Sequence, residues 1–475
     1  MIQKLLISYI LKPLGKLMDY CGEKTRETLF VLFSLFIFLI SFVQLSPLFP
    51  STPYIVTFVA GCFCMGMMIL SMLRADIQPV RFSPVLIGLW LSAGILMTIA
   101  AVRFNVDWLS DAIMYVIACP IAFIVWGNVD YRKILRLLIR SCVISFVIFF
   151  IVSSLFFPLD STQYKSFFSN PNGTSGYLAI AFACLLINAF QDHNRLWKKI
   201  VSWVLLGLCG GVLQYTSSRS GQLAAICTFS FAGILFVFQN KHEIKQRILY
   251  RLLPIALSLL ILIPGTLYIM QVSYKGMCAV TDAASSIFNS ADTDPSPNES
   301  TDGDKGTNAG DNPDEDNNPF IDYNAVNQAN KDRFNASGKD LNSFTTGRAD
   351  IWKAFLDKST PFGTGEQPSF YIESINKTYS NPHMTLLLFA YQYGWICAGI
   401  YLLFNILSGF KSIYFVLKNK TDVLSLLPFA ITITYGIIFL LETVNLPFVY
   451  MSTVLYFFVQ APLLKKTSHT ERPAE

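Results

Sequence analysis

The stretch LFVLFSLFIFLISFVQL, residues 29–45, decides the fold, because it carries no charged side chain and with its flanks is long enough to cross a bilayer as a helix. Inside lipid, every backbone amide must be hydrogen-bonded within the protein, so such a run predicts a membrane helix. The whole chain has the same character, with 53% hydrophobic and only 14% charged residues among 475. A water-soluble protein of this length needs less apolar side chain to fill its core. We therefore expect the chain to lie in a bilayer.

Further apolar runs predict an all-α polytopic membrane protein with about 12 transmembrane helices. After the first, the expected spans are 53–73, 84–102, 112–126, 141–157, 176–190, 200–215, 222–238, 252–270, 395–410, 424–441 and 448–464. Lys and Arg concentrate in alternate connections, whereas the other short loops hold only Arg103, Lys165 and Arg219. Because basic residues are retained on the cytoplasmic side, we expect both termini to be cytoplasmic and the protein to lie in the plasma membrane.

This topology divides the chain into five parts. Residues 1–28 form a cytoplasmic amphipathic N-terminus, 29–270 hold transmembrane helices 1–9, 271–394 form one large extracytoplasmic loop, 395–464 hold helices 10–12, and 465–475 form a cytoplasmic tail. No cleavable signal peptide is evident at the start. The net charge of +5 follows from the basic inner loops, so it does not indicate nucleic acid binding. The ten cysteines show neither a disulfide framework nor zinc spacing, and we expect no metal and no other cofactor.

The large loop begins with an acidic segment, 292–318, that has no large apolar residue and is therefore expected to be a disordered linker. A calcium site is the alternative, but the segment lacks the spacing of an EF-hand loop. Further on, Thr345 to Lys358 predicts a short amphipathic helix lying against the membrane surface. One face of this helix would carry Ile351, Trp352, Phe355 and Leu356.

The loop then returns to the membrane. PFGTGEQPSF, residues 361–370, is punctuated by Gly and Pro and predicts an irregular connection. Residues 384–393 predict a helix that enters from the outer surface, either partly re-entrant or continuous with the tenth span.

Charged side chains avoid the middle of the predicted spans. The exceptions lie at outer ends and are Arg103, Asp107, Asp111, Arg219 and Glu442. A transporter usually places its coupling residues near the midplane at broken helices, and this chain does not.

Histidine is equally informative. Of the four histidines, only His383 is expected on the outer side. Imidazole exchanges protons near neutral pH, so His383 is a candidate general base. The alternative is that it caps the following helix or bonds its own loop.

Three further polar residues are candidates for ligand binding. Arg219 lies among serines at the end of the seventh span, and its guanidinium is suited to bind phosphate oxygens through two hydrogen bonds. The alternative is that it anchors the protein to lipid headgroups. Arg348 is a second candidate anion clamp or an ordinary solvated residue. Asn172, in FFSNPNGTSG before the sixth span, belongs to a turn and helix start, and its amide is also placed to line an outer cavity.

Taken together and in this order, FFSNPNGTSG, SSRSG, GRADIW, GTG and NPH followed by an apolar run ending in YGW resemble the signature of the O-antigen ligase/polymerase family. The resemblance implies a GT-C-like fold and a metal-independent, inverting glycosyltransferase acting on the extracytoplasmic face. Its donor would be an undecaprenyl-diphosphate-linked oligosaccharide and its acceptor a saccharide. Arg219 and Arg348 would hold the diphosphate, His383 would activate the acceptor, and Trp352 and Tyr393 would stack on sugar rings. The frequent His-Asn pair of the family is absent, since Met384 follows His383.

The resemblance leaves the substrate open. We expect a polymerase that joins oligosaccharide repeat units into a capsular or other surface polysaccharide, with O-antigen-ligase-type transfer to a different acceptor as the alternative. A flippase and a chain-length regulator are the expected protein partners. From other classes, a lipid-linked oligosaccharide flippase would need a cationic central cavity, and a purely structural membrane partner would leave the outer histidine and two arginines unexplained.

Overall fold

The computed structural model describes residues 2–49, 52–105, 108–158, 163–192, 195–290, 328, 331, 348–366, 368–372, 377–444 and 447–466. The expectations for the acidic segment 292–318 and for Asp107 lie outside these residues, as does most of the tail 465–475.

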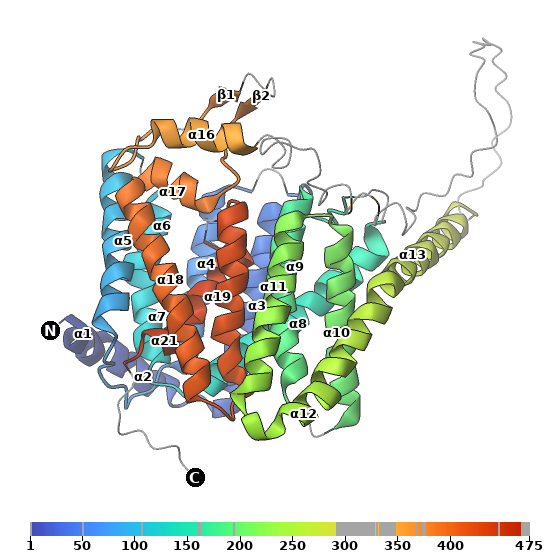
Figure 1. The fold of residues 1–475 in the computed structure, drawn as a ribbon, viewed down its shortest axis with the longest axis horizontal. Helices are drawn as coiled ribbons and strands as arrows, with labels where there is room; N and C mark the ends of the chain where they lie inside the picture. Colours follow the sequence, from blue (N-terminus) through green and yellow to red (C-terminus); the bar gives the residue numbers. More distant parts are fainter. Residues whose placement is uncertain are drawn as a thin grey trace.

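The described residues form a helical bundle in which eleven helices are long and apolar enough to cross a membrane. This confirms the all-α polytopic membrane fold (Figure 1). The crossing helices are α3 (Glu23–Leu45), α4 (Tyr54–Met72), α5 (Pro84–Arg103), α6 and α7 (Leu109–Ile113 and Cys119–Trp126, joined by a π-helical turn), α8 (Tyr131–Phe156), α9 (Pro171–Phe190), α10 (Leu196–Tyr215), α11 (Arg219–Gln239), α12 and α13 (Ile244–Arg247 and Leu253–Ser290), α18 (Trp395–Lys418) and α19 (Leu426–Leu441).

Two helices extend beyond the apolar runs that predict them. Helix α3 begins at Glu23, where an acidic residue in the first turn interacts favourably with the helix dipole. Helix α13 continues past Met270 to Ser290 despite Pro264 inside it. Polarity ends a membrane span without ending a helix, which explains why hydropathy placed both boundaries too close to the membrane centre.

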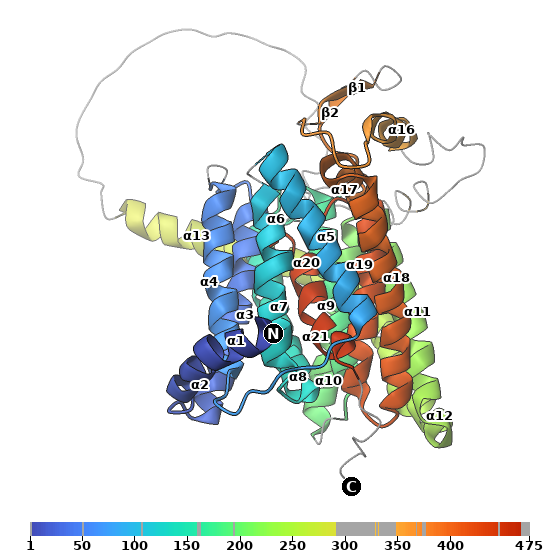
Figure 2. The same cartoon turned by 90° about the vertical axis from the view of Figure 1, so that its left-hand side faces the viewer.

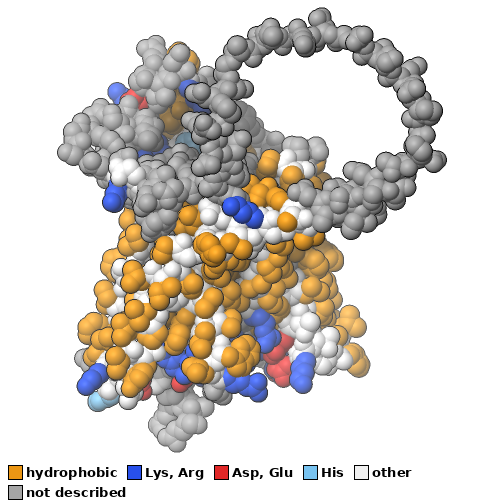
Figure 3. All heavy atoms as spheres, turned by 90° about the vertical axis from the view of Figure 1, so that its right-hand side faces the viewer, with side chains coloured by type: hydrophobic (Ala, Val, Ile, Leu, Met, Phe, Trp, Pro, Cys, Tyr) orange, Lys and Arg blue, Asp and Glu red, His pale blue; other side chains and the backbone are white. Residues whose placement is uncertain are grey.

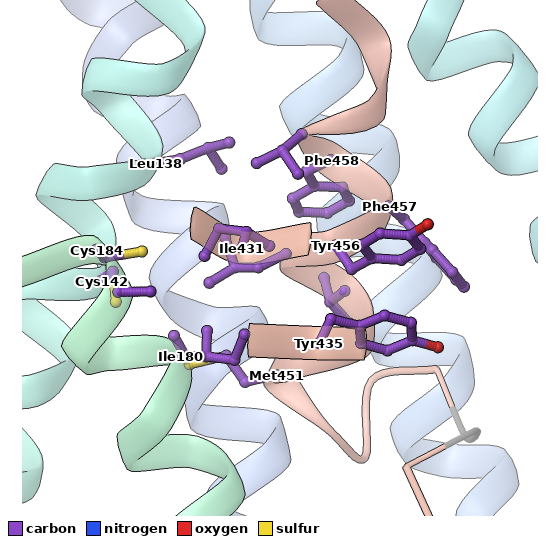
Figure 4. Packing of buried hydrophobic residues seen from close by; sticks show 14 of the residues in the cluster. Leu138, Cys142, Ile180, Cys184, Ile431, Tyr435, Met451, Tyr456, Phe457 and Phe458 are labelled. Carbon is purple, nitrogen blue, oxygen red and sulfur yellow. The ribbon is translucent and has the colours of Figure 1, made fainter. Parts of the chain in front are cut away.

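The twelfth expected span is short and interrupted. Its two pieces are α20 (Met451–Phe458) and α21 (Gln460–Leu464), and every residue of α20 is buried. Helix α9 is similarly enclosed, with 94% of its span buried. Figure 4 shows Tyr456 of α20 beside Tyr435 of α19, and their rings stack at 4.1 Å between centroids. The core therefore centres on α9, α19 and α20, with the other helices around them.

One end of the bundle, which we call the loop face, carries the folded part of the large loop (Figure 2). Helix α16 (Arg348–Lys358) and a hairpin of β1 (Phe370–Ile372) and β2 (Lys377–Tyr379) lie above α17 (Thr385–Tyr393). Ile351 and Phe355 of α16 are buried against this subdomain rather than against lipid. Leu356, expected on the same face, is instead 59% exposed. It follows Ile351 by five residues and Phe355 by one, and neither spacing keeps it on the stripe that packs on α17.

Helix α17 is separate from α18, because the helical conformation is interrupted at Gly394 between them. Gly394 has φ +95°, and a Cβ there would overlap the carbonyl oxygen of Pro361. Gly363 has φ +90°, and its Cβ would overlap the carbonyl oxygen of Gln392. The two glycines therefore let the loop at 361–365 pack backbone to backbone against the end of α17.

The opposite end, which we call the basic face, carries the N-terminal helices α1 (Ile2–Leu6) and α2 (Lys12–Met18) and the end of α21. The backbone N–H of Lys466 donates to the carbonyl of Arg81 at 2.7 Å, which joins the end of α21 to the connection between α4 and α5. Figure 3 shows Lys and Arg side chains gathered at this end, below a broad hydrophobic surface.

Candidate functional site

A buried carboxylate, Glu442, lies directly after α19 at the loop face and is 7% exposed. Its oxygens accept hydrogen bonds from Ser220 Oγ at 3.0 Å, Arg348 Nη2 at 3.0 Å and Asn172 Nδ2 at 3.2 Å. The Nδ1 atom of His383 lies 3.9 Å from Oε2 of the same carboxylate. Segments far apart in the chain thus converge on one acidic group. We refer to Asn172, Ser220, Arg348, His383 and Glu442 as the Glu442 cluster.

Arg348 is held at both of its terminal nitrogens. Nη2 pairs with Glu442, and Nη1 donates to the carbonyl of Leu441 at 2.6 Å. Leu441 is the last residue of α19, so the guanidinium also caps a helix C-terminus, where a cation is favoured. The side chain is 21% exposed, which leaves part of it open to a ligand from the loop face.

His383 is positioned by hydrogen bonds between its own loop and the segment after α19. Asn381 Oδ1 accepts from the backbone N–H of His383 at 2.8 Å and from Thr443 Oγ1 at 2.5 Å. Thr385 bonds the same segment, donating from N and Oγ1 to the carbonyl of Glu442 at 3.0 and 2.8 Å. His383 has φ +52°, a conformation that costs about 1–3 kcal/mol in a non-glycine residue and persists where the surroundings enforce it.

The His383 side chain remains accessible, because it is 36% exposed. Asn381, considered from the sequence as a substitute for the auxiliary amide of the family, uses its carbonyl oxygen to brace this loop.

The start of α9 and the start of α11 supply the neutral donors. Asn170 caps α9, accepting from the backbone N–H of Gly173 at 2.7 Å, and this places Asn172 in the first turn. Ser218 Oγ donates to Asn172 Oδ1 at 3.0 Å and lies 3.0 Å from Ser220 Oγ. Two helix N-termini therefore meet beside Glu442, and their backbone N–H groups favour an anionic ligand there.

Arg219 is the first residue of α11 and is half-buried. It stands between Ser218 and Ser220, whose hydroxyls bond the cluster, so its backbone is within about 4 Å of a residue that contacts Glu442. The structure thus brings the backbone of Arg219 and the side chains of Arg348 and His383 to one region of the loop face.

The two candidate aromatics lie differently. Trp352 Nε1 donates to the carbonyl of Pro382 at 2.9 Å, so the indole supports the loop that precedes His383. Tyr393 is 2% exposed, and its hydroxyl donates to Asp111 Oδ2 at 2.5 Å. The structure does not bring Tyr393 to the Glu442 cluster.

The sequence pointed to most of this site but not to its centre. Glu442 stood out only as a charge at the end of an apolar span, and Ser218 and Ser220 only as neighbours of Arg219. The available signal for Glu442 was that a carboxylate next to lipid needs a partner, and two unexplained arginines were expected on the same side.

Chemically, the cluster combines one guanidinium group, hydroxyl and amide donors, helix N-termini and an accessible imidazole around one carboxylate, and Arg219 adjoins Ser220 in the chain. Such a set has the groups needed to bind an oxyanion and to move a proton at a neighbouring atom. Residues 203–402 match the family model described as O-antigen ligase. This range contains Arg219, Arg348 and His383, while Asn172 and Glu442 lie outside it. Searches of curated proteins and of solved structures gave no match.

Proposed function

Because residues 203–402 match the family model described as O-antigen ligase, we propose that the chain belongs to the O-antigen ligase/polymerase family and is a glycosyltransferase that polymerises polyprenyl-diphosphate-linked oligosaccharide repeat units into a surface polysaccharide. The observation that carries the proposal is the convergence of Arg348, His383, Asn172 and Ser220 on Glu442. A cation suited to bind phosphate and a potential base then both lie next to one carboxylate.

The reaction takes place on the extracytoplasmic side in this proposal. The distribution of charge supports that orientation, because Lys and Arg gather at the basic face and the positive-inside rule puts such an end in the cytoplasm. The Glu442 cluster lies at the opposite end, at the membrane boundary. A lipid-linked donor therefore reaches it with the polyprenyl tail still in the bilayer.

In the proposed mechanism, Arg348 and Arg219 bind the diphosphate of the donor, and Ser218 and Ser220 add neutral donors. The acceptor hydroxyl attacks the anomeric carbon from the side opposite the diphosphate, so the new C–O bond forms as the carbon–phosphate oxygen bond breaks and the configuration inverts. Negative charge grows on the leaving diphosphate, and preorganised guanidinium groups stabilise it more in the transition state than in the ground state. No metal ion is required by this scheme.

The proton of the acceptor hydroxyl passes to His383. Its Nδ1 faces Glu442 at 3.9 Å, and the carboxylate stabilises the imidazolium as it forms, which leaves Nε2 to accept the proton. Glu442 acts as a positioning residue, since it holds Arg348 and His383 on either side of itself.

Polymerase and ligase activities, both of which this site suits, differ in the acceptor that they use. A polymerase transfers the growing chain to a new repeat unit, whereas a ligase transfers a finished chain to a different acceptor. We favour the polymerase and expect a flippase that supplies the donor and a regulator of chain length as partners.

The test uses the full-length protein in liposomes with a synthetic polyprenyl-diphosphate repeat unit, and the product ladder is resolved on a gel. We expect His383→Gln and Arg348→Lys to abolish the ladder. Arg103→Lys, an exposed arginine at the same face, is the matched control and should leave the ladder unchanged, as should EDTA.

Other outcomes would contradict parts of the proposal. A ladder that persists in His383→Gln removes that residue from the reaction. A single product on a second saccharide, without chain growth, indicates a ligase. Transbilayer movement of labelled donor without any new glycosidic bond indicates a flippase.

A further inference from the structure

A cavity of about 790 Å³ opens at the basic face between α8 and the connection from α9 to α10. Figure 1 shows these three helices side by side. Four cations line the cavity, namely Arg136, Arg140, Arg195 and Lys198. Arg136 and Arg140 are one helical turn apart on α8, so both side chains extend from the same face of that helix.

These four cations form no ion pair with any carboxylate that the structure describes. Asp192 is the one acidic residue in the lining, and it already accepts from Arg251 at 2.6 Å and Lys199 at 3.1 Å. Hydrogen bonds from Arg251 and Lys199 hold the pKa of Asp192 below its usual value, and both partners lie against its Oδ1 atom. The cavity therefore has an excess of positive charge.

A neighbouring cavity shows that this excess is not general to the basic face. Its lining includes Glu23, Arg26, Asp130 and Lys133. There Lys133 pairs with Glu23 at 2.6 Å, and Arg26 pairs with Asp19 at 3.3 Å. Retention of Lys and Arg in the cytoplasm explains cations at this face, but it does not explain why one cavity leaves four of them without carboxylates.

Beside the amides of Asn188 and Gln191, the lining also has an apolar part on α8, and this part points to a lipid. Ile139 lies between the two arginines on α8, and Val143 and Ile144 continue along this helix toward the membrane interior. A ligand that uses the whole cavity therefore has an anionic head at the membrane surface and an alkyl chain beside α8. Soluble phosphate would use only the cationic part.

We propose that this cavity binds the headgroup of an anionic phospholipid from the leaflet at the basic face, with two phosphate groups shared among the four cations. Cationic pockets between membrane helices bind such headgroups, and each Lys or Arg near the surface strengthens attraction to anionic lipid about fivefold. The site is separate from the Glu442 cluster, which lies at the other face, so it stands whether or not the proposed transferase activity does.

The experiment measures lipid binding to the purified full-length protein in detergent, by native mass spectrometry and by the shift in melting temperature. The probes are cardiolipin with two phosphates, phosphatidylglycerol with one, zwitterionic phosphatidylcholine, and pyrophosphate. We expect affinity to fall in the order cardiolipin, phosphatidylglycerol, phosphatidylcholine. The double variant Arg136→Gln/Arg140→Gln should weaken cardiolipin binding about 25-fold.

Two further variants make the result decisive. Lys245→Gln/Lys420→Gln removes the same charge from exposed positions outside the cavity and should change cardiolipin affinity less than twofold. Asp192→Asn removes the one carboxylate of the lining and should strengthen binding. Equal weakening by both double variants would mean attraction to the whole basic face and would overturn the site. If pyrophosphate raises the melting temperature as much as cardiolipin does, the proposal that the ligand is a lipid is overturned.

Discussion

Replacing Glu442 with glutamine removes one charge while keeping the size of the side chain. Its carboxylate lies 3.9 Å from His383 Nδ1, and at an effective dielectric constant of about 20 such a pair of charges interacts by about 4 kcal/mol. The imidazole is 36% exposed, so we halve this figure for solvent screening, to about 2 kcal/mol. If the carboxylate stabilises the imidazolium that forms during transfer, Glu442→Gln should slow the chemical step about 30-fold.

The assay is single-turnover transfer from a polyprenyl-diphosphate oligosaccharide in liposomes, normalised to the amount of folded protein. Glu366→Gln is the matched control, because Glu366 is an exposed glutamate at the same face. A Glu442→Gln rate equal to that of the unmodified protein would refute the charge argument. A large loss of melting temperature together with the rate would show that Glu442 mainly holds Arg348 and Ser220 in place.

Three other substitutions test the structure around the site. Gly394→Ala places a Cβ on a residue with φ +95° and against the Pro361 carbonyl, so the free energy of unfolding should fall by at least about 1 kcal/mol. Gly399→Ala is the control, because a Cβ there meets nothing within 4 Å, and it should not lower the free energy of unfolding. Tyr393→Phe removes the donor to buried Asp111 and should cost about 1–3 kcal/mol of stability. The transfer rate of folded protein should not change. A raised KM for saccharide would instead support the predicted role of Tyr393 in sugar stacking. Ser220→Ala deletes one hydrogen bond to Glu442 and should lower the transfer rate about five- to tenfold, and an unchanged rate would place Ser220 outside the site.

Hydropathy predicted the fold well because bilayer thickness sets helix length. The spans and their order follow from apolar runs, and errors appear where a helix outlasts its apolar part, as α13 does to Ser290. The twelfth span was harder, since the hydropathy of residues 448–464 does not show that the helix breaks at Val459, where Pro462 three residues later was the available signal.

The sequence predicted individual residues of the site but not which of them contact each other. Arg348 and His383 stood out as a cation and an imidazole on the expected outer side, but they meet through Glu442, which follows α19, the third helix after His383. Tyr393 is a residue whose environment the sequence did not reveal. Its sequence context suggests an interfacial aromatic, yet its partner Asp111 lies 282 residues away. Hydrogen-bond partners across such separations depend on tertiary packing, which no local pattern encodes.

The enclosure of α20 and α21 has a consequence for how the protein is made. At about 1.5 Å per residue, Met451–Leu464 is about 21 Å long, shorter than the roughly 30 Å hydrocarbon layer, and its residues face protein rather than lipid. Because α20 and α21 are synthesised after α9 and α19, they enter a slot between helices that were made before them. A chain that ends before Met451 would keep that slot open beside α9 and α19, and a separately synthesised C-terminal peptide should be able to fill it and restore the bundle.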